Sequence, residues 1–119
     1  MTLSEIREIA HNGNYDFASH SLSHPPLDTL TGTRLIHEVC DSRTQLIALL
    51  GETVTTFIYP SGKMPKFDRD TLMKQCGYDL AFTTSYGKKW QESVSKFDVN
   101  RYRISHDTDT HFFDILLTF

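Results

Sequence analysis

Two histidines four residues apart, His20 and His24, stand in the stretch His20-Ser21-Leu22-Ser23-His24-Pro25-Pro26. The neutral imidazole is the commonest protein ligand for a transition metal. A spacing of four would place both rings on one face of a helix, but Pro25 favours an extended backbone at His24. We therefore expect the pair on a loop that leaves a strand, where binding sites are often built. The residues alone leave two interpretations open, a metal site and a pair of ordinary surface histidines.

The composition places the chain among ordinary globular proteins. Its 119 residues suit one domain, and 39 % hydrophobic with 23 % charged residues is typical of a packed core with a solvated surface. The net charge of −3 and the isoelectric point near 6.0 argue against a general nucleic-acid binder. No apolar run is long enough to span a bilayer, and the first residues lack the basic and apolar regions of a signal peptide.

The chain has two cysteines, Cys40 and Cys76. Each lies on the apolar side of a predicted helix, so the pattern favours two buried thiols over a disulfide.

Hydrophobic periodicity and turn residues predict helices that alternate with strands. Thr2 and Glu5 form a capping box for the first helix. The expected helices cover about 2–13, 33–50, 68–77 and 108–119, and the expected strands cover 15–19, 54–59, 79–84 and 99–105. This order predicts a single α/β domain, residues 1–119, with a mostly parallel sheet. His20 and the turn Pro60-Ser61-Gly62 both follow strand ends, so we expect them on the same edge of that sheet.

With these residues placed, nearly the whole chain resembles the C-terminal portion of a polysaccharide deacetylase domain, the NodB-homology carbohydrate esterases. His20-Ser21-Leu22-Ser23-His24-Pro25 matches the family's H-[S/T]-x-x-H-P motif. Phe57–Gly62 falls where members carry F-R-P-P-Y-G or F-A-Y-P-Y-G, and Cys76–Thr84 resembles the helix-Gly-Tyr-strand segment that follows. The resemblance implies a partial distorted (β/α) barrel that lacks its N-terminal strands.

The resemblance also implies a reaction, the hydrolysis of acetyl groups on an N-acetylated or O-acetylated polysaccharide. In such a site two His and one Asp hold zinc or another divalent metal, which polarises the carbonyl and activates water. A second Asp is the base, a backbone N–H stabilises the oxyanion, and a histidine near the C-terminal end protonates the leaving group.

Only part of that site can be transferred to this chain. His20 and His24 match the metal ligands, and Ser21 matches the hydroxyl that orients a ring or the loop. Ser61 stands where the family usually has a Tyr whose main-chain N–H faces the oxyanion, a role that survives a change of side chain. Ile58 replaces an Arg that some members use to contact the catalytic acid.

The T-F-D-D motif, which supplies the base and the carboxylate ligand, is missing upstream of His20. We therefore expect a metal half-site on a piece of a longer product or on a shortened relative, weak or inactive as a catalyst by itself. The alternative is a non-catalytic, degenerate module that binds a metal or a glycan. Half a barrel exposes sheet edges, so we also expect a homo-oligomer that covers them.

Four other residues are candidates for a role in catalysis or substrate binding, although an ordinary surface or structural role is open for them too. His106 is the candidate acid, or a surface histidine; Trp90, Tyr59 and Pro60 are candidates for substrate binding. Trp90 could equally cover the edge of the core, and Tyr59 could support the turn after its strand. The sequence does not identify the sugar. Family members usually act outside the cell or at its wall, whereas this chain shows no export signal.

Overall fold

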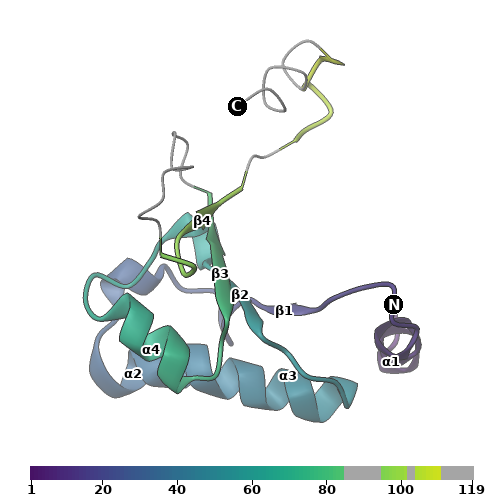
Figure 1. Ribbon diagram of the computed structural model, residues 1–119, viewed down its shortest axis with the longest axis horizontal. Helices are drawn as coiled ribbons and strands as arrows, with labels where there is room; N and C mark the ends of the chain where they lie inside the picture. The colour runs from purple at the N-terminus through teal and green to yellow at the C-terminus, as the bar shows by residue number, and fades with distance from the viewer. Residues whose placement is uncertain (85–94, 102–103, 111–119) are drawn as a thin grey trace.

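The computed structural model describes residues 1–84, 95–101 and 104–110 (Figure 1). The strands are β1 (Ala18–Ser19), β2 (Thr56–Ile58), β3 (Leu80–Thr83) and β4 (Val99–Asn100). The helices are α1 (Leu3–His11), α2 (Gly32–Ile36), α3 (Ser42–Leu50) and α4 (Arg69–Gln75). A π-helical turn, η2 (His37–Asp41), joins α2 to α3, and η1 (Leu27–Thr29) and η3 (Pro60–Gly62) are short 3-10 turns.

The four strands form one parallel sheet whose spatial order, β1-β2-β3-β4, is also their order in the sequence. Each crossover therefore advances the sheet in the same direction, and right-handed crossovers of this kind place their helices on the same side. Figure 1 shows α2, α3 and α4 grouped on one side of the strands. The predicted α/β layering with a parallel sheet is confirmed.

The core lies between the sheet and these helices. Its fully buried members come from η2, β2, α4 and the start of β3, among them Val39, Phe57, Met73 and Tyr78. A smaller cluster of Ala10, Leu50 and Val54 fixes α1 against the end of α3 and the approach to β2. The two clusters thus pack the sheet against the helices and fix the positions of the carboxyl ends of β1 and β2.

The capping box predicted for Thr2 and Glu5 is present at the start of α1. The Thr2 hydroxyl accepts the Glu5 N–H at 3.3 Å, while the Glu5 carboxylate accepts the Thr2 N–H at 2.6 Å. Gly51 ends α3 with a φ of 74°, which glycine adopts without strain. Asp68 precedes α4 as expected, but its side chain makes no capping hydrogen bond and its φ is 46°.

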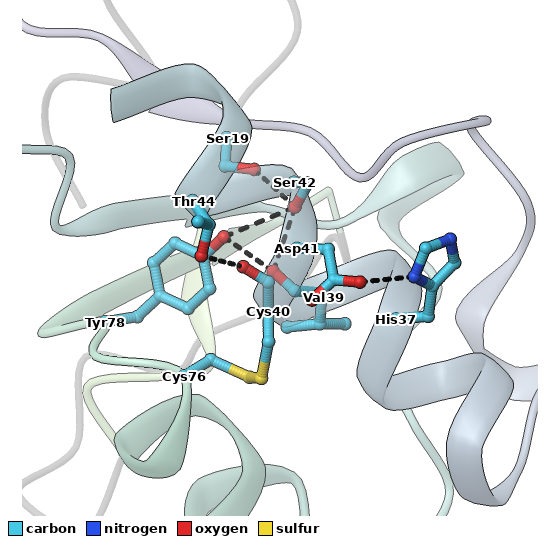
Figure 2. Close-up of a disulfide and its surroundings, with 9 residues drawn as sticks. All are labelled: Ser19, His37, Val39, Cys40, Asp41, Ser42, Thr44, Cys76 and Tyr78. Atoms are coloured by element: carbon cyan, nitrogen blue, oxygen red, sulfur yellow. Dashed lines mark hydrogen bonds and ion pairs between the residues drawn. A yellow bond between two sulfur atoms is a disulfide. The ribbon is translucent and has the colours of Figure 1, made fainter. Parts of the chain in front are cut away.

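The predicted helix over 33–50 is interrupted by η2 (Figure 2). There the Val39 carbonyl accepts hydrogen bonds from the hydroxyls of Ser42 and Tyr78, each at 2.9 Å. Side chains thus satisfy a carbonyl at the point where the regular helical pattern changes.

The expectation of two free thiols is wrong. Cys40 in η2 and Cys76 at the end of α4 form a disulfide, with Cα atoms 4.7 Å apart (Figure 2). Cys76 is buried and Cys40 is partly buried, and the packing of η2 against α4 brings the two sulfur atoms together.

Three expectations concern the rest of the chain. The strands β1 and β4 are shorter than predicted, because residues 15–17 and those after Asn100 make no ladder pairs among the described residues. The body of the expected last helix, 111–119, lies outside the described residues. Within the part that the structure describes, no helix is long and apolar enough to cross a membrane.

Candidate metal-binding site

His20 and His24 lie together on the loop that leaves β1. Their ring centroids are 4.8 Å apart and the ring planes are inclined by 74°, an edge-to-face arrangement. Both residues are exposed at the surface. Parallel pairing of Ser19 with Phe57 sets His20 beside the end of β2, at the edge of the sheet where the η3 turn begins.

The His20 ring is oriented by the backbone of the neighbouring strand. Its Nδ1 lies 2.7 Å from the carbonyl oxygen of Ile58. A carbonyl can only accept, so Nδ1 carries the proton and, in the neutral ring, Nε2 keeps its lone pair. A histidine whose second nitrogen is fixed in this way is the usual form of a metal ligand.

The loop between the two rings has an unusual backbone. Ser21 has a φ of 66° and His24 a φ of 60°, both in the left-handed region that L side chains rarely adopt. The Ser21 hydroxyl accepts the N–H of His24 at 3.0 Å and so closes the loop on itself. Residues held in this region are frequent at functional sites, because the surrounding contacts must offset their strain.

The histidine pair fits one half of a divalent-metal site. With metal–nitrogen bonds of about 2.1 Å and roughly 1 Å from nitrogen to ring centre, two rings on one ion have centroids no more than about 6 Å apart. The observed 4.8 Å satisfies that limit. Among residues 1–84, 95–101 and 104–110, no group of three or more His, Cys, Asp or Glu is arranged to hold a metal. Among the described residues, the two histidines therefore form a pair with no third His, Cys, Asp or Glu arranged beside them.

The η3 turn lies at the end of β2 and presents the Ser61 peptide. Ser61 is exposed and has a φ of 54°, and Gly62 follows with a φ of 67°. A Cβ added to Gly62 would lie 2.1 Å from the Thr84 hydroxyl oxygen and 3.0 Å from the Thr84 nitrogen, so only glycine fits against β3 here. The Thr83 hydroxyl donates to the Gly62 carbonyl at 2.9 Å and fixes the turn further.

The structure places Tyr59 and Pro60, two expected substrate contacts, inside the core. Tyr59 is 0 % exposed and donates its hydroxyl to the Phe97 carbonyl at 2.8 Å, and Pro60 is also buried. Burial raises the pKa of the Tyr59 phenol far above its usual range. Both residues therefore lie beneath the turn, whereas Ser61, the next residue, is exposed.

His106 and Trp90 are not brought to the histidine pair by anything described. The His106 side chain is 90 % exposed and pairs with its neighbour Asp107, Nε2 to Oδ1, at 2.9 Å. Trp90 lies outside the described residues.

Sequence reasoning missed Glu38, which lies in η2 and is only 5 % exposed. Its carboxylate accepts the N–H groups of Leu22 at 3.0 Å and Ser23 at 2.9 Å, and it also accepts the Ser23 hydroxyl. Burial alone would raise the pKa of Glu38, but these hydrogen bonds outweigh it and leave the pKa below its ordinary value of 4.5. The signal in the sequence was a glutamate directly before Val39 on the apolar side of the helix.

A comparison with protein families decides the relationship. The sequence profile described as polysaccharide deacetylase matches residues 1–81, which include the histidine pair and the η3 turn. The chain belongs to the polysaccharide deacetylase family. The family assignment made from the three motifs is thereby confirmed. A comparison with curated protein sequences gave no significant match.

Solved polysaccharide deacetylases share the fold. The polysaccharide deacetylase BC0361 from Bacillus cereus is 26 % identical with a TM-score of 0.77, over 97 % of this chain and 36 % of that one. The deacetylase PplD from Streptococcus pyogenes is 23 % identical with a TM-score of 0.81, over 97 % of this chain and 50 % of that one. The chain therefore corresponds to a third to a half of the length of these deacetylases, and the expected partial barrel is confirmed.

Proposed function

We propose that this chain carries the histidine half of a metal-dependent site that removes acetyl groups from a polysaccharide. The observation that carries the proposal is the His20–His24 pair, with the His20 Nδ1 held by the Ile58 carbonyl and the two rings 4.8 Å apart. Family membership supports the reaction class, and the ring geometry supports the metal.

Each residue of the site then has a physical role. His20 and His24 would hold a divalent ion, of which zinc suits imidazole ligands well. When bound, such an ion polarises an acetyl carbonyl and lowers the pKa of water. The backbone N–H of Ser61 would donate to the carbonyl oxygen as negative charge develops there. Ser21 keeps the loop closed through the N–H of His24.

The reaction needs groups beyond this pair. Hydrolysis adds water to the acetyl carbon, breaks its bond to nitrogen or oxygen, and releases acetate and the free amine or alcohol. The step requires a base for water, a third metal ligand and a proton donor for the leaving group. That His106 is the proton donor for the leaving group stays a prediction. We propose that the base and the third ligand are contributed by groups other than the described residues, so this chain alone is weak or inactive.

The substrate class follows from the family and not from a described contact. An N-acetylated polysaccharide is the leading proposal, and an O-acetylated one is the alternative. The Streptococcus pyogenes relative was solved in complex with acetate, the product that either reaction would release.

The test measures Zn²⁺ binding and acetate release together. Wild-type chain should bind Zn²⁺ in isothermal titration calorimetry, and His20→Ala and His24→Ala should each abolish detectable binding. His11→Ala is the matched control, since His11 is an exposed histidine on α1 that contacts Glu52. Zinc binding that persists in the His20→Ala, His24→Ala double variant would refute the ligand assignment.

Acetate release from an acetylated chito-oligosaccharide is then assayed with the complete gene product. Activity that falls with either histidine variant supports the deacetylase. Zinc binding without activity in the complete product would instead favour the non-catalytic binding module.

We also propose that the chain self-associates. The strand β1 pairs only with β2 among the described strands, so its other edge is unpaired. A pocket of about 260 Å³ opens beside that edge, between β1 and α3, and includes His20 and Leu46 in its lining. Unpaired strand edges attract further strands. Light scattering at increasing concentration should show a homo-oligomer, and a monomer at millimolar concentration would contradict the proposal.

A further inference from the structure

Glu38 is a buried carboxylate that faces the histidine loop. It accepts three hydrogen bonds, and all three donors belong to Leu22 and Ser23, the residues midway between His20 and His24. Among the described residues, no lysine or arginine forms an ion pair with it. Burying a charge is costly unless polar groups compensate it, so the loop itself supplies the compensation.

The loop in turn needs an external support. Its two left-handed residues, Ser21 and His24, flank the dipeptide that Glu38 binds. A non-glycine residue in this region costs on the order of 1–3 kcal/mol and persists only where neighbouring contacts over-determine it. The N–H of Leu22 belongs to the peptide that follows Ser21, and the N–H of Ser23 belongs to the next peptide, so Glu38 fixes the two peptide planes between Ser21 and Ser23. The N–H of His24 is held in turn by the Ser21 hydroxyl.

A second contact holds the other side of His20 to the same helix. The buried Ser19 hydroxyl donates to the Ser42 hydroxyl at 2.8 Å, and Ser42 donates to the Val39 carbonyl (Figure 2). The helical stretch η2–α3 therefore contacts the chain immediately before His20 and again between the two histidines. The backbone on both sides of His20 is therefore held by this one helical stretch.

We propose that Glu38 is a positioning residue for the metal-binding histidines. Its carboxylate holds Leu22 and Ser23 so that the loop keeps its closed form and the rings of His20 and His24 stay within reach of one ion. Glu38 touches neither the ion nor the substrate. The inference rests on the proposed function for the metal, while the positioning of the rings can be measured without any metal.

The first measurement uses the metal-free chain. In wild type, NMR should show a nuclear Overhauser effect between the ring protons of His20 and His24. Glu38→Gln removes the charge and leaves a single amide oxygen for the two loop N–H groups, while its NH2 takes the side of the Ser23 hydroxyl, so this effect should weaken while the amide spectrum of the sheet is retained. Glu8→Gln, an exposed glutamate on α1, is the matched control and should leave the ring contact unchanged.

The second measurement is the affinity for Zn²⁺ alone. We expect Glu38→Gln to bind Zn²⁺ roughly tenfold more weakly, because mutating a residue that hydrogen-bonds to the ligand loop of a metal site commonly lowers the metal affinity by that much or more. Ser23→Ala removes one donor and keeps the two backbone donors, so its loss should be smaller and in the same direction. A merely structural role would lower the melting temperature of Glu38→Gln and leave both the ring contact and the affinity unchanged.

The outcomes separate the two proposals. If wild type fails to bind Zn²⁺, the proposed metal site fails, and the ring contact alone decides whether Glu38 positions the histidines. If wild type binds Zn²⁺ and Glu38→Gln keeps both the ring contact and the affinity within twofold, the positioning role is overturned. If Glu38→Gln does not fold, Ser23→Ala decides by the same two readouts.

Discussion

The loop that carries His20 and the segment 104–110 that carries His106 both present exposed histidines after a strand. The difference lies in what holds each ring. The Nδ1 of His20 is bonded to a backbone carbonyl of the neighbouring strand, whereas His106 pairs only with the adjacent, equally exposed Asp107. In Figure 1 the yellow-green residues 104–110 lie away from the sheet.

Residue type and strand-end position alone do not give an imidazole a fixed direction. An exposed imidazole acquires a defined direction when its second nitrogen is fixed and its backbone is restrained. The loop after β1 has both, through Ile58, Ser42 and Glu38. An exposed ion pair between neighbouring residues, such as His106–Asp107, restrains little because water screens it.

The largest expected effect concerns the disulfide, which secures the helix that supports the His20 loop. It joins residues 36 apart in sequence, and closing a loop of that length stabilises a fold by roughly 4 kcal/mol in the chain-entropy account. We expect the Cys40→Ser, Cys76→Ser double variant to lose about that free energy of unfolding in urea titrations. Wild type reduced with dithiothreitol should lose a similar amount. A loss below about 0.5 kcal/mol in both would mean that η2 and α4 hold together without the bond.

The next effect concerns the acid sensitivity of the loop. The folded-state pKa of Glu38 lies below its ordinary value of 4.5, so the unfolded chain takes up this proton first as pH falls. The stabilisation from ionised Glu38 is complete above pH 4.5 and is lost as pH falls through the lowered folded-state pKa. At pH 7, Glu38→Gln should cost about 1.5–3 kcal/mol, the range for hydrogen bonds to a charged group.

The measurement is the free energy of unfolding from pH 7 down to pH 3. The gap between wild type and Glu38→Gln should narrow on acidification, whereas Glu8→Gln should run parallel to wild type. A gap that stays constant with pH would show that the carboxylate charge of Glu38 contributes nothing.

The η3 turn, at the same edge of the sheet as the His20 loop, is expected to show a smaller effect on stability. Gly62 and Gly13 have similar φ values, 67° and 71°, but a Cβ meets Thr84 at Gly62 and nothing within 4 Å at Gly13. Gly62→Ala should therefore cost about 2 kcal/mol, and Gly13→Ala about 1 kcal/mol, from the left-handed backbone alone. Thermal unfolding measures both. Equal losses would mean that Thr84 moves aside and that the turn is not tightly held against β3.

Most of the fold could be predicted from local patterns in the sequence. The capping box at Thr2, the glycine at position 51 and the alternation of helices with β-branched strands all reflect contacts between near neighbours. The strand ends were less predictable, because β1 and β4 have ladder partners for only two residues each. The disulfide was missed because it depends on how two helices face each other, which spacing along the chain does not specify.

The candidate site divides in the same way. The histidine pair and the turn at Ser61 could be placed at one edge because parallel strands end together. Glu38, Ser42 and the Ile58 carbonyl could not, since each acts through a hydrogen bond formed across the sheet or from a helix. The burial of Tyr59 could not be predicted either, because it depends on the tertiary core.

The smallest expected effect is at His106, whose ring contacts only the exposed neighbouring residue Asp107. His106→Ala removes a side chain that is 90 % exposed and whose ion-pair partner is itself 79 % exposed, so the free energy of unfolding should change by less than about 0.5 kcal/mol. Zinc affinity of the chain should also be unchanged, because nothing described links this ring to His20. Calorimetry of the variant beside His20→Ala provides the contrast directly. A loss of affinity at His106 comparable to that at His20 would show that the segment after β4 folds back onto the histidine pair, and fixed geometry would then no longer distinguish the two histidines.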